Sequence, residues 1–315
     1  MSKRNWALVA ATFVSIIYGI TFTVAKDVMP KYVAPFGFIA MRVGGSVVLF
    51  WMVDFMMGLF RKARNDKKIA LNDFPRIIAA ALFGVAINML AFFKGLSYTS
   101  PIMAAVLMVT TPIIVLILSS ILMKERMKKR KILGIVLGLV GTVTIILYGK
   151  SMINAPNASL GNLLVFINAI SYGLYLIIVK KLMDKYNAFT FVKWIYTFGF
   201  LMVLPFGWNE FHTIDWSSIP DPILWKIGFV ILFSTFFTYL LNLLSMRELK
   251  PTTVAVFIYL QPLFATIIAV SYGKDDLSLV KLLSAVLIFS GVFLVTQKNS
   301  SQSQLAVAEK TEDRD

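Results

Sequence analysis

Long apolar stretches are the feature of this sequence that most restricts its fold. An α-helix needs about 20 apolar residues to cross the ~30 Å hydrocarbon core of a bilayer, with a range of roughly 17 to 25. Ten stretches meet or approach this length, at about residues 6–25, 34–57, 77–93, 98–122, 132–149, 160–179, 190–208, 225–245, 252–272 and 279–297. The sequence therefore predicts an all-α polytopic membrane protein with ten transmembrane helices.

Composition excludes most soluble and enzymatic classes. Charged residues make up 15% of the chain and hydrophobic residues 58%, so a soluble globule would lack the polar surface it needs. Without a cysteine there is no disulfide framework or thiolate chemistry, and the one histidine, His212, lies alone in an expected loop. We therefore expect no enzyme, no metal and no cofactor.

The distribution of basic residues predicts the orientation. An even number of spans puts both termini on one side, where 23 of the 31 Lys and Arg residues fall, against seven on the other side. The positive-inside rule makes that side cytoplasmic, so the net charge of +15 reflects topology rather than nucleic-acid binding. We expect a bacterial inner membrane, with the lipid bilayer as partner, and a disordered cytoplasmic tail over 298–315.

An internal repeat divides the chain into 1–150 and 151–297. At an offset of 150 residues Pro112 meets Pro262 and Gly141 meets Gly291, and at an offset of 154 Tyr18-Gly19 meets Tyr172-Gly173. Matched prolines and Tyr-Gly pairs in one order indicate a duplication. Because each repeat holds five spans, the halves must insert with opposite orientation, and such inverted repeats are typical of secondary transporters.

Several motifs of the two halves match a known family. They are Tyr-Gly early in the first and sixth spans, Pro35…Arg42 opening the second, Thr111-Pro112 leading to Lys124-Glu125, and the second copy Gln261-Pro262 leading to Gly273-Lys274-Asp275. Through them the chain resembles the EamA-type members of the drug/metabolite transporter superfamily, over roughly 6–297. Family members commonly have Gly-Glu where this chain has Lys124-Glu125, so the match is loose there. The resemblance implies export of a small metabolite.

Polar side chains form one stripe on each of two expected helices. The stripe of 160–179 is Asn168, Ser171, Tyr172 and Tyr175, and that of 225–245 is Thr235, Thr238, Tyr239 and Asn242. Spacings of three and four place each set on one helical face. Two interpretations stay open: hydrogen bonds between packed helices, or the lining of a substrate cavity. We favour the cavity and add to it Tyr18, Thr21, Asn88, Phe92 and Gln261.

Pro112 and Pro262 stand near the middles of the fourth and ninth spans. Each removes an amide donor and crowds the carbonyl four residues back, which predicts either a static kink or a hinge beside the cavity. In the fifth span, Gly134, Gly138 and Gly141 form a face of small residues, which predicts a close helix contact within the bundle or between protomers.

Arg42 is the one cation well inside an expected span. A buried guanidinium needs a partner, and Asp54, three turns further along the helix, is too distant. Arg42 is therefore either structural, with loop carbonyls as partners, or a site for a carboxylate or other anionic group of the solute.

The leading functional hypothesis is a secondary transporter that exports amino acids or related amphipathic metabolites, without ATP, by alternating access around a central cavity. The alternative is a membrane-embedded enzyme or a receptor-like binding protein, for which the spans offer no buried catalytic cluster. Proton antiport and facilitated diffusion both stay open, although no span places an Asp or Glu at its middle. The protein is expected to be a monomer or a homodimer.

Overall fold

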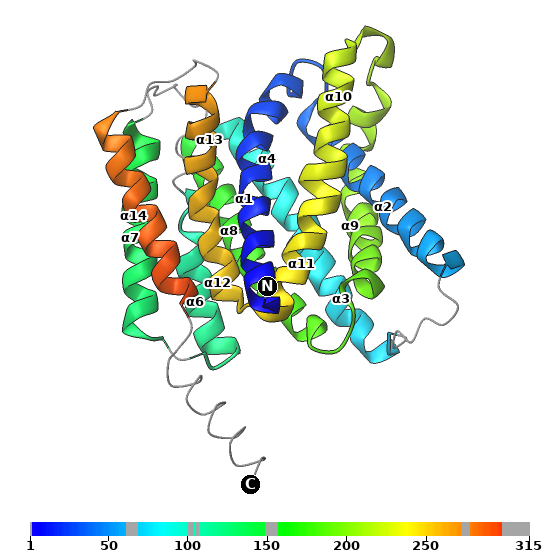
Figure 1. Ribbon diagram of the computed structural model, residues 1–315. Helices are drawn as coiled ribbons and strands as arrows, with labels where there is room; N and C mark the ends of the chain where they lie inside the picture. Colours follow the sequence, from blue (N-terminus) through cyan, green and yellow to red (C-terminus); the bar gives the residue numbers. More distant parts are fainter. Residues whose placement is uncertain are drawn as a thin grey trace.

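The computed structural model describes residues 2–60, 69–99, 104, 107–125, 127–148, 157–271 and 278–297. Within these ranges every regular element is helical, as the sequence predicts (Figure 1). The first half contains α1 (Lys3–Val28), α2 (Pro35–Phe60), η1 (Leu71–Asp73), α3 (Phe74–Ala81), η2 (Leu82–Ala86), α4 (Ile87–Tyr98), α6 (Thr111–Leu122) and α7 (Lys129–Tyr148). The second half contains α8 (Ala158–Met183), α9 (Ala188–His212), η3 (Trp216–Ser218), α10 (Asp221–Phe229), η4 (Val230–Phe237), α11 (Thr238–Glu248), α12 (Pro251–Val256), η5 (Phe257–Tyr259), α13 (Leu260–Ser271) and α14 (Leu279–Thr296).

Seven helical segments of the described chain are long and apolar enough to cross a membrane. They are Pro35–Met57, Leu71–Tyr98, Ser159–Met183, Ala188–His212, Asp221–Glu248, Pro251–Ile268 and Leu279–Thr296. The protein is therefore an integral, multi-pass membrane protein. The helices α1, α6 and α7 fall in the three other expected spans, so the count of ten stays a prediction. The expected tail, 298–315, lies outside the described residues.

Short polar side chains mark where several of these helices begin. Asn157 accepts a hydrogen bond from the Leu160 amide before α8, and Asn187 accepts one from the Phe189 amide before α9. Ser278 does the same for Lys281 before α14. Each cap satisfies an amide that has no partner within its helix, so the apolar runs start at defined residues.

The most closely packed helix pairs each join the first half of the chain to the second. They are α7 with α14, α2 with α9, α4 with α8, α1 with α11, α1 with α13, and α6 with α8. In Figure 1 the pairs α7–α14 and α2–α9 lie at opposite sides of the bundle. Neither half can therefore form its core without the other.

Glycines set the distance of the α7–α14 pair. A Cβ atom at Gly134 would lie 2.7 Å from the Gly291 carbonyl oxygen, and one at Gly141 would lie 2.7 Å from that of Ser284. These distances are shorter than any real Cβ contact, so glycine is required for the approach. The predicted face of small residues thus makes its contact within the bundle.

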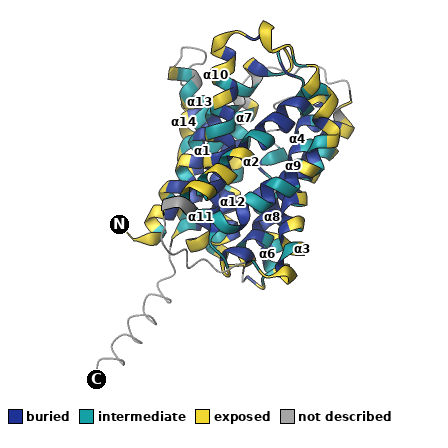
Figure 2. Ribbon diagram, turned by 90° about the vertical axis from the view of Figure 1, so that its right-hand side faces the viewer, coloured by how far each residue is buried: buried dark blue, intermediate teal, exposed yellow. Residues whose placement is uncertain are grey.

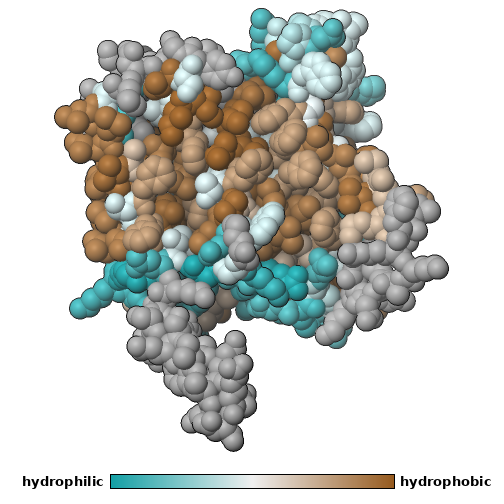
Figure 3. Space-filling model, viewed as in Figure 1, coloured by the Kyte–Doolittle hydropathy of each residue, from teal (hydrophilic) through white to brown (hydrophobic). Residues whose placement is uncertain are grey.

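The outer surface matches a bilayer. An apolar band separates hydrophilic ends (Figure 3), while buried residues gather along the middle of the bundle (Figure 2). Arg4 of α1 donates a hydrogen bond to the Thr296 carbonyl at the end of α14. The start of α1 and the end of α14 therefore lie on the same side of the molecule.

Pro112 and Pro262 each lie in the first turn of an α-helix, and a short segment that is not α-helical precedes that helix. A turn at 109–110 precedes α6, and the Thr111 hydroxyl donates to the Met108 carbonyl, four residues before Pro112, at 2.6 Å. The 3₁₀ segment η5 precedes α13, and Ser15 of α1 donates to its Phe257 carbonyl at 2.8 Å. Proline is tolerated in a first turn because no intrahelical donor is lost there. Use of these segments as hinges stays a prediction.

Candidate functional site

Two segments of π-helix, η2 and η4, connect the residues of the two polar stripes. Ser171 and Tyr239 contact η2, and Thr235 is part of η4. Shifting Leu82–Ala86 by the repeat offset of 150 gives residues 232–236, all within η4. Such segments bond residue i to i+5, are rare, and occur frequently at functional sites. No sequence pattern predicted them.

In η2 the wider turn releases a backbone carbonyl. The Ile87 amide donates to the Leu82 carbonyl, five residues back, and not to that of Phe83, four residues back. The Ser171 hydroxyl of α8 donates to the Phe83 carbonyl at 2.7 Å. Ser171 is buried, with 2% of its surface exposed. It therefore supplies the hydrogen bond that the helix has given up.

Two more stripe residues donate to carbonyls of α4 and η2. Asn168 of α8 donates through Nδ2 to the Asn88 carbonyl at 2.7 Å, and the Tyr239 hydroxyl of α11 donates to the Gly84 carbonyl at 3.1 Å. These contacts agree with the interpretation of the stripes as hydrogen bonds between helices. They join η2 and α4 to both polar stripes.

In η4 the stripe residues satisfy carbonyls of their own segment. The Thr238 amide donates to the Phe233 carbonyl, five residues back, while its hydroxyl donates to the Ser234 carbonyl at 2.6 Å. The Thr235 hydroxyl donates to the Val230 carbonyl at 2.8 Å. Both threonines are fully buried. Their hydroxyl groups thus stabilise the π turn, and a role of these residues in lining a cavity stays a prediction.

Tyrosine rings from three helices meet beside these segments. Ring centroids are 5.9 Å apart for Tyr172 and Tyr175, 6.2 Å for Tyr175 and Tyr239, and 5.0 Å for Tyr239 and Tyr196. Tyr175 packs directly against Gly84, where a Cβ atom would lie 2.2 Å from the ring. We call Tyr172, Tyr175, Tyr196 and Tyr239 the tyrosine cluster.

Tyr196, on α9, was missed by the sequence reasoning. Its span shows no polar stripe, but Tyr196 and Thr197 interrupt the apolar run. That interruption was the available signal.

Four buried polar atoms of the described residues in this region have no hydrogen-bond partner. They are the hydroxyl oxygens of Tyr175, Tyr196 and Ser234 and the Oδ1 atom of Asn168. Tyr175 and Tyr196 are at most 1% exposed. Unsatisfied groups of this kind are rare in native proteins and call for a bound water or a ligand.

Arg42 enters the same region from α2. It is 6% exposed, its Nε atom donates to the Thr235 hydroxyl at 3.1 Å, and its guanidinium carbon is 6.0 Å from the centre of the Phe93 ring. The structural interpretation predicted loop carbonyls as partners, and the observed partner is a hydroxyl group instead. Asp54 bonds to Lys193 at 2.5 Å and not to Arg42, as expected from its distance along the helix.

The other expected cavity residues are buried to different extents. Tyr18, Thr21, Asn88, Phe92 and Gln261 are half-buried, and Asn242 is buried. Tyr18 lies near Thr238 and Arg42. The Thr21 hydroxyl donates to Ile17 of its own helix at 2.7 Å.

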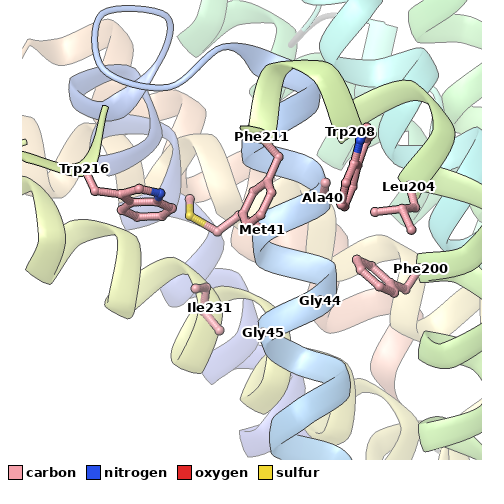
Figure 4. Close-up of a pocket in the computed structure, with 10 residues that line it drawn as sticks. All are labelled: Ala40, Met41, Gly44, Gly45, Phe200, Leu204, Trp208, Phe211, Trp216 and Ile231. Atoms are coloured by element: carbon pink, nitrogen blue, oxygen red, sulfur yellow. The ribbon is translucent and has the colours of Figure 1, made fainter. Parts of the chain in front are cut away.

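A separate groove of about 310 Å³ lies across α2, between α9 and η4 (Figure 4). Its lining is apolar and consists of Ala40, Met41, Gly44, Gly45, Phe200, Leu204, Trp208, Phe211, Trp216 and Ile231. None of these is an expected cavity residue. Since the lining holds no charged side chain to orient a polar solute, we place the candidate site at the tyrosine cluster and Arg42.

The described residues contain no group of three His, Cys, Asp or Glu side chains able to hold a metal ion. His212 is exposed beside Trp208, with ring centroids 5.9 Å apart.

Comparisons with known proteins agree with this picture. The profile of the EamA-like transporter family matches residues 5–147 and 159–297. Among curated relatives, the uncharacterized transporter YetK of Bacillus subtilis is 26% identical over 85% of this chain and 82% of its own length. An uncharacterized transporter of Archaeoglobus fulgidus is 25% identical over 94% of this chain and 99% of its own length. A WAT1-related protein of Arabidopsis thaliana is 24% identical over 94% of this chain and 84% of its own length.

The fold also matches a solved structure. A protein known by its crystal structure superposes with a TM-score of 0.74, covering 93% of this chain and 98% of its own, at 15% sequence identity. At that identity the likeness concerns the fold alone.

Proposed function

Because the chain belongs to the EamA-like transporter family, we propose that this membrane transporter carries a small amphipathic solute by alternating access around the tyrosine cluster. Its relatives are named as transporters and not as enzymes. We propose export as the direction, since the resemblance of the motifs implies it. Transport is secondary, without ATP, and facilitated diffusion is the simplest coupling for a site whose one fixed charge is Arg42.

The repeat supports alternating access. We propose two inverted repeats of five helices, 1–150 and 151–297, giving ten spans with both termini in the cytoplasm of a bacterial inner membrane. The family profile matches twice, and the packing is consistent with an exchange of the halves: α4 meets α8 as α11 meets α1, and α6 meets α8 as α13 meets α1. The π segments also correspond. Two similar halves of opposite orientation let one chain adopt inward-open and outward-open states of comparable energy.

One observation carries the location of the site. The unpartnered hydroxyls of Tyr175 and Tyr196 lie among tilted and edge-to-face rings where the stripe residues Tyr175 and Tyr239 meet. Rings offer an apolar solute body a surface, and free hydroxyls offer its polar groups a hydrogen bond. A solute bound here would satisfy groups that the folded chain leaves without partners.

The test compares three tyrosine-to-phenylalanine variants in proteoliposomes. The vesicles are loaded with a metabolite mixture, and efflux is measured for each compound by mass spectrometry. We expect Tyr175→Phe and Tyr196→Phe to reduce efflux severalfold without loss of folded protein. Tyr259→Phe is the matched control, because its hydroxyl is also buried and unpartnered but lies against Gly138, in another part of the core.

Unchanged efflux in both cluster variants would move the site elsewhere. If the wild-type protein released no compound faster than empty vesicles, the alternative of a non-transporting receptor or enzyme would gain support.

A further inference from the structure

Arg42 is a charged group at a position where charge is costly. It lies seven residues after Pro35, the first residue of α2, which at 1.5 Å per residue is about 10 Å along the helix. Its side chain is 6% exposed. Burial removes the hydration of the guanidinium, so a stable structure needs an anion or several acceptors to compensate.

The described residues supply only part of that compensation. Among the described residues, the guanidinium of Arg42 has one hydrogen bond, from Nε to Thr235, and a contact with the face of the Phe93 ring. No described carboxylate lies within 4.0 Å of the guanidinium. Glu210 of α9 instead uses its Oε2 atom to accept from the amides of Phe36 and Gly37, in the first turn of α2, at 2.6 and 2.9 Å.

The hydrogen bond to Thr235 determines which nitrogens of the guanidinium can still donate to a ligand. Its hydroxyl donates to the Val230 carbonyl and therefore accepts the Nε hydrogen of Arg42 through a lone pair. With Nε held, the edge formed by the two terminal nitrogens keeps its donors for another ligand. Two parallel N–H donors match the two oxygens of a carboxylate.

The surroundings of Arg42 are aromatic. Its charge acts on the hydroxyl groups of Tyr18, Tyr196 and Tyr239, and its guanidinium carbon lies over the Phe93 ring. A ligand whose anionic group binds Arg42 can therefore reach Tyr196 and Tyr239 of the tyrosine cluster, where rings offer its apolar body a packing surface.

We propose that the transported solute is an organic monocarboxylate with an apolar body, bound through its carboxylate to the terminal nitrogens of Arg42. This inference rests on the proposed transport function. One arginine balances one negative charge, whereas a phosphate monoester carries about −1.5 to −2 at pH 7 and would leave charge uncompensated. Thr235 is the positioning residue, because it orients the guanidinium without contacting the solute.

The test uses pairs of solutes that differ only in the charged group: N-acetyl-leucine and N-acetyl-leucinamide, and hippurate and hippuramide. Affinity is measured on purified protein by thermal stabilisation, and efflux of each compound by mass spectrometry from loaded proteoliposomes. We expect the wild-type protein to bind at least one acid more than tenfold tighter than its amide.

Variants then assign the preference to Arg42. Arg42→Gln should reduce the acid-to-amide ratio to near one, and Arg42→Lys should weaken acid binding more than tenfold, because an ammonium cannot bind two oxygens in parallel. Thr235→Val should lower the ratio in part, while Thr235→Ser should retain it. Arg76→Gln controls for loss of a positive charge, since Arg76 pairs with Asp73 at the end of the bundle.

Equal binding of acid and amide by the wild-type protein would overturn the inference, and so would a preference that persists in Arg42→Gln. If Arg42→Gln does not fold, Arg42→Lys and Thr235→Val decide, and full acid preference in both refutes the proposal. If amides are released as fast as acids, the transport function is supported and the inference about the carboxylate is refuted. No efflux of any solute, combined with no binding, removes both.

Discussion

Replacing Ser171 by alanine tests whether the polar stripe of α8 holds the π segment or contacts the solute. The substitution removes the hydroxyl that donates to the Phe83 carbonyl at 2.7 Å. That carbonyl lacks its usual helical donor, because the Ile87 amide is bound to Leu82. The variant therefore leaves a buried acceptor unsatisfied in the membrane.

The expected cost is about 1 to 1.5 kcal/mol. An orphaned buried acceptor costs ~1–3 kcal/mol in general, while hydrogen bonds between transmembrane helices average ~0.6 kcal/mol with a maximum near 1.7. Removing one small oxygen creates little cavity, so the hydrogen bond dominates. A loss of this size reduces the ratio of folded to unfolded protein by a factor of roughly 5 to 13.

Unfolding by SDS in mixed micelles, followed by far-UV circular dichroism, measures this loss. The matched control is Ser271→Ala, because the exposed Ser271 hydroxyl donates only to Ile267 of its own helix, at 2.9 Å. The control should stay within about 0.5 kcal/mol of the wild type. If Ser171→Ala is as stable as the control but loses transport, Ser171 contacts the solute and our assignment is refuted.

Three further predictions concern the Gly84 contact, the backbone of Lys124 and the membrane topology. Gly84→Ala places a Cβ atom 2.2 Å from the Tyr175 ring, so we expect the free energy of unfolding to fall by ~1–3 kcal/mol in the same assay. Combining it with Tyr175→Leu should recover part of that stability. A Gly84→Ala variant as stable as the wild type would contradict this prediction. Lys124 has a left-handed backbone, with φ of 52°, so Lys124→Gly should raise the free energy of unfolding by about 0.5–1 kcal/mol, and a lower stability would refute the strain. Cysteines introduced at Lys128 and Thr213 should react with an impermeant maleimide only from the cytoplasm and only from outside, respectively; labelling of Thr213 from the cytoplasm alone would refute the ten-span topology.

The sequence alone was sufficient for the class of the protein and for the faces of its helices. Hydropathy over ~20 residues is a local sum, and lipid leaves the backbone little choice but a helix. The spacing of Asn168, Ser171, Tyr172 and Tyr175 is also local, because 3.6 residues per turn place them on one face whatever lies opposite. The left-handed φ of Lys124, by contrast, is visible only in the structure, although glycine adopts that conformation far more readily than lysine.

The partners of those faces were decided only by the tertiary structure. Arg42 and Thr235 are 193 residues apart, and Tyr239 and Gly84 are 155 apart, so no local pattern relates them. A π turn differs from an α turn by one residue in its hydrogen bonding, and in η2 the carbonyl it releases is satisfied by a donor from another helix, Ser171 for Phe83. That donor is within reach because Gly84 lets Tyr175 and α8 approach the segment closely. Helix faces follow from chain chemistry, but the pairing of faces depends on how closely whole helices can approach, and that distance is a property of the packed bundle.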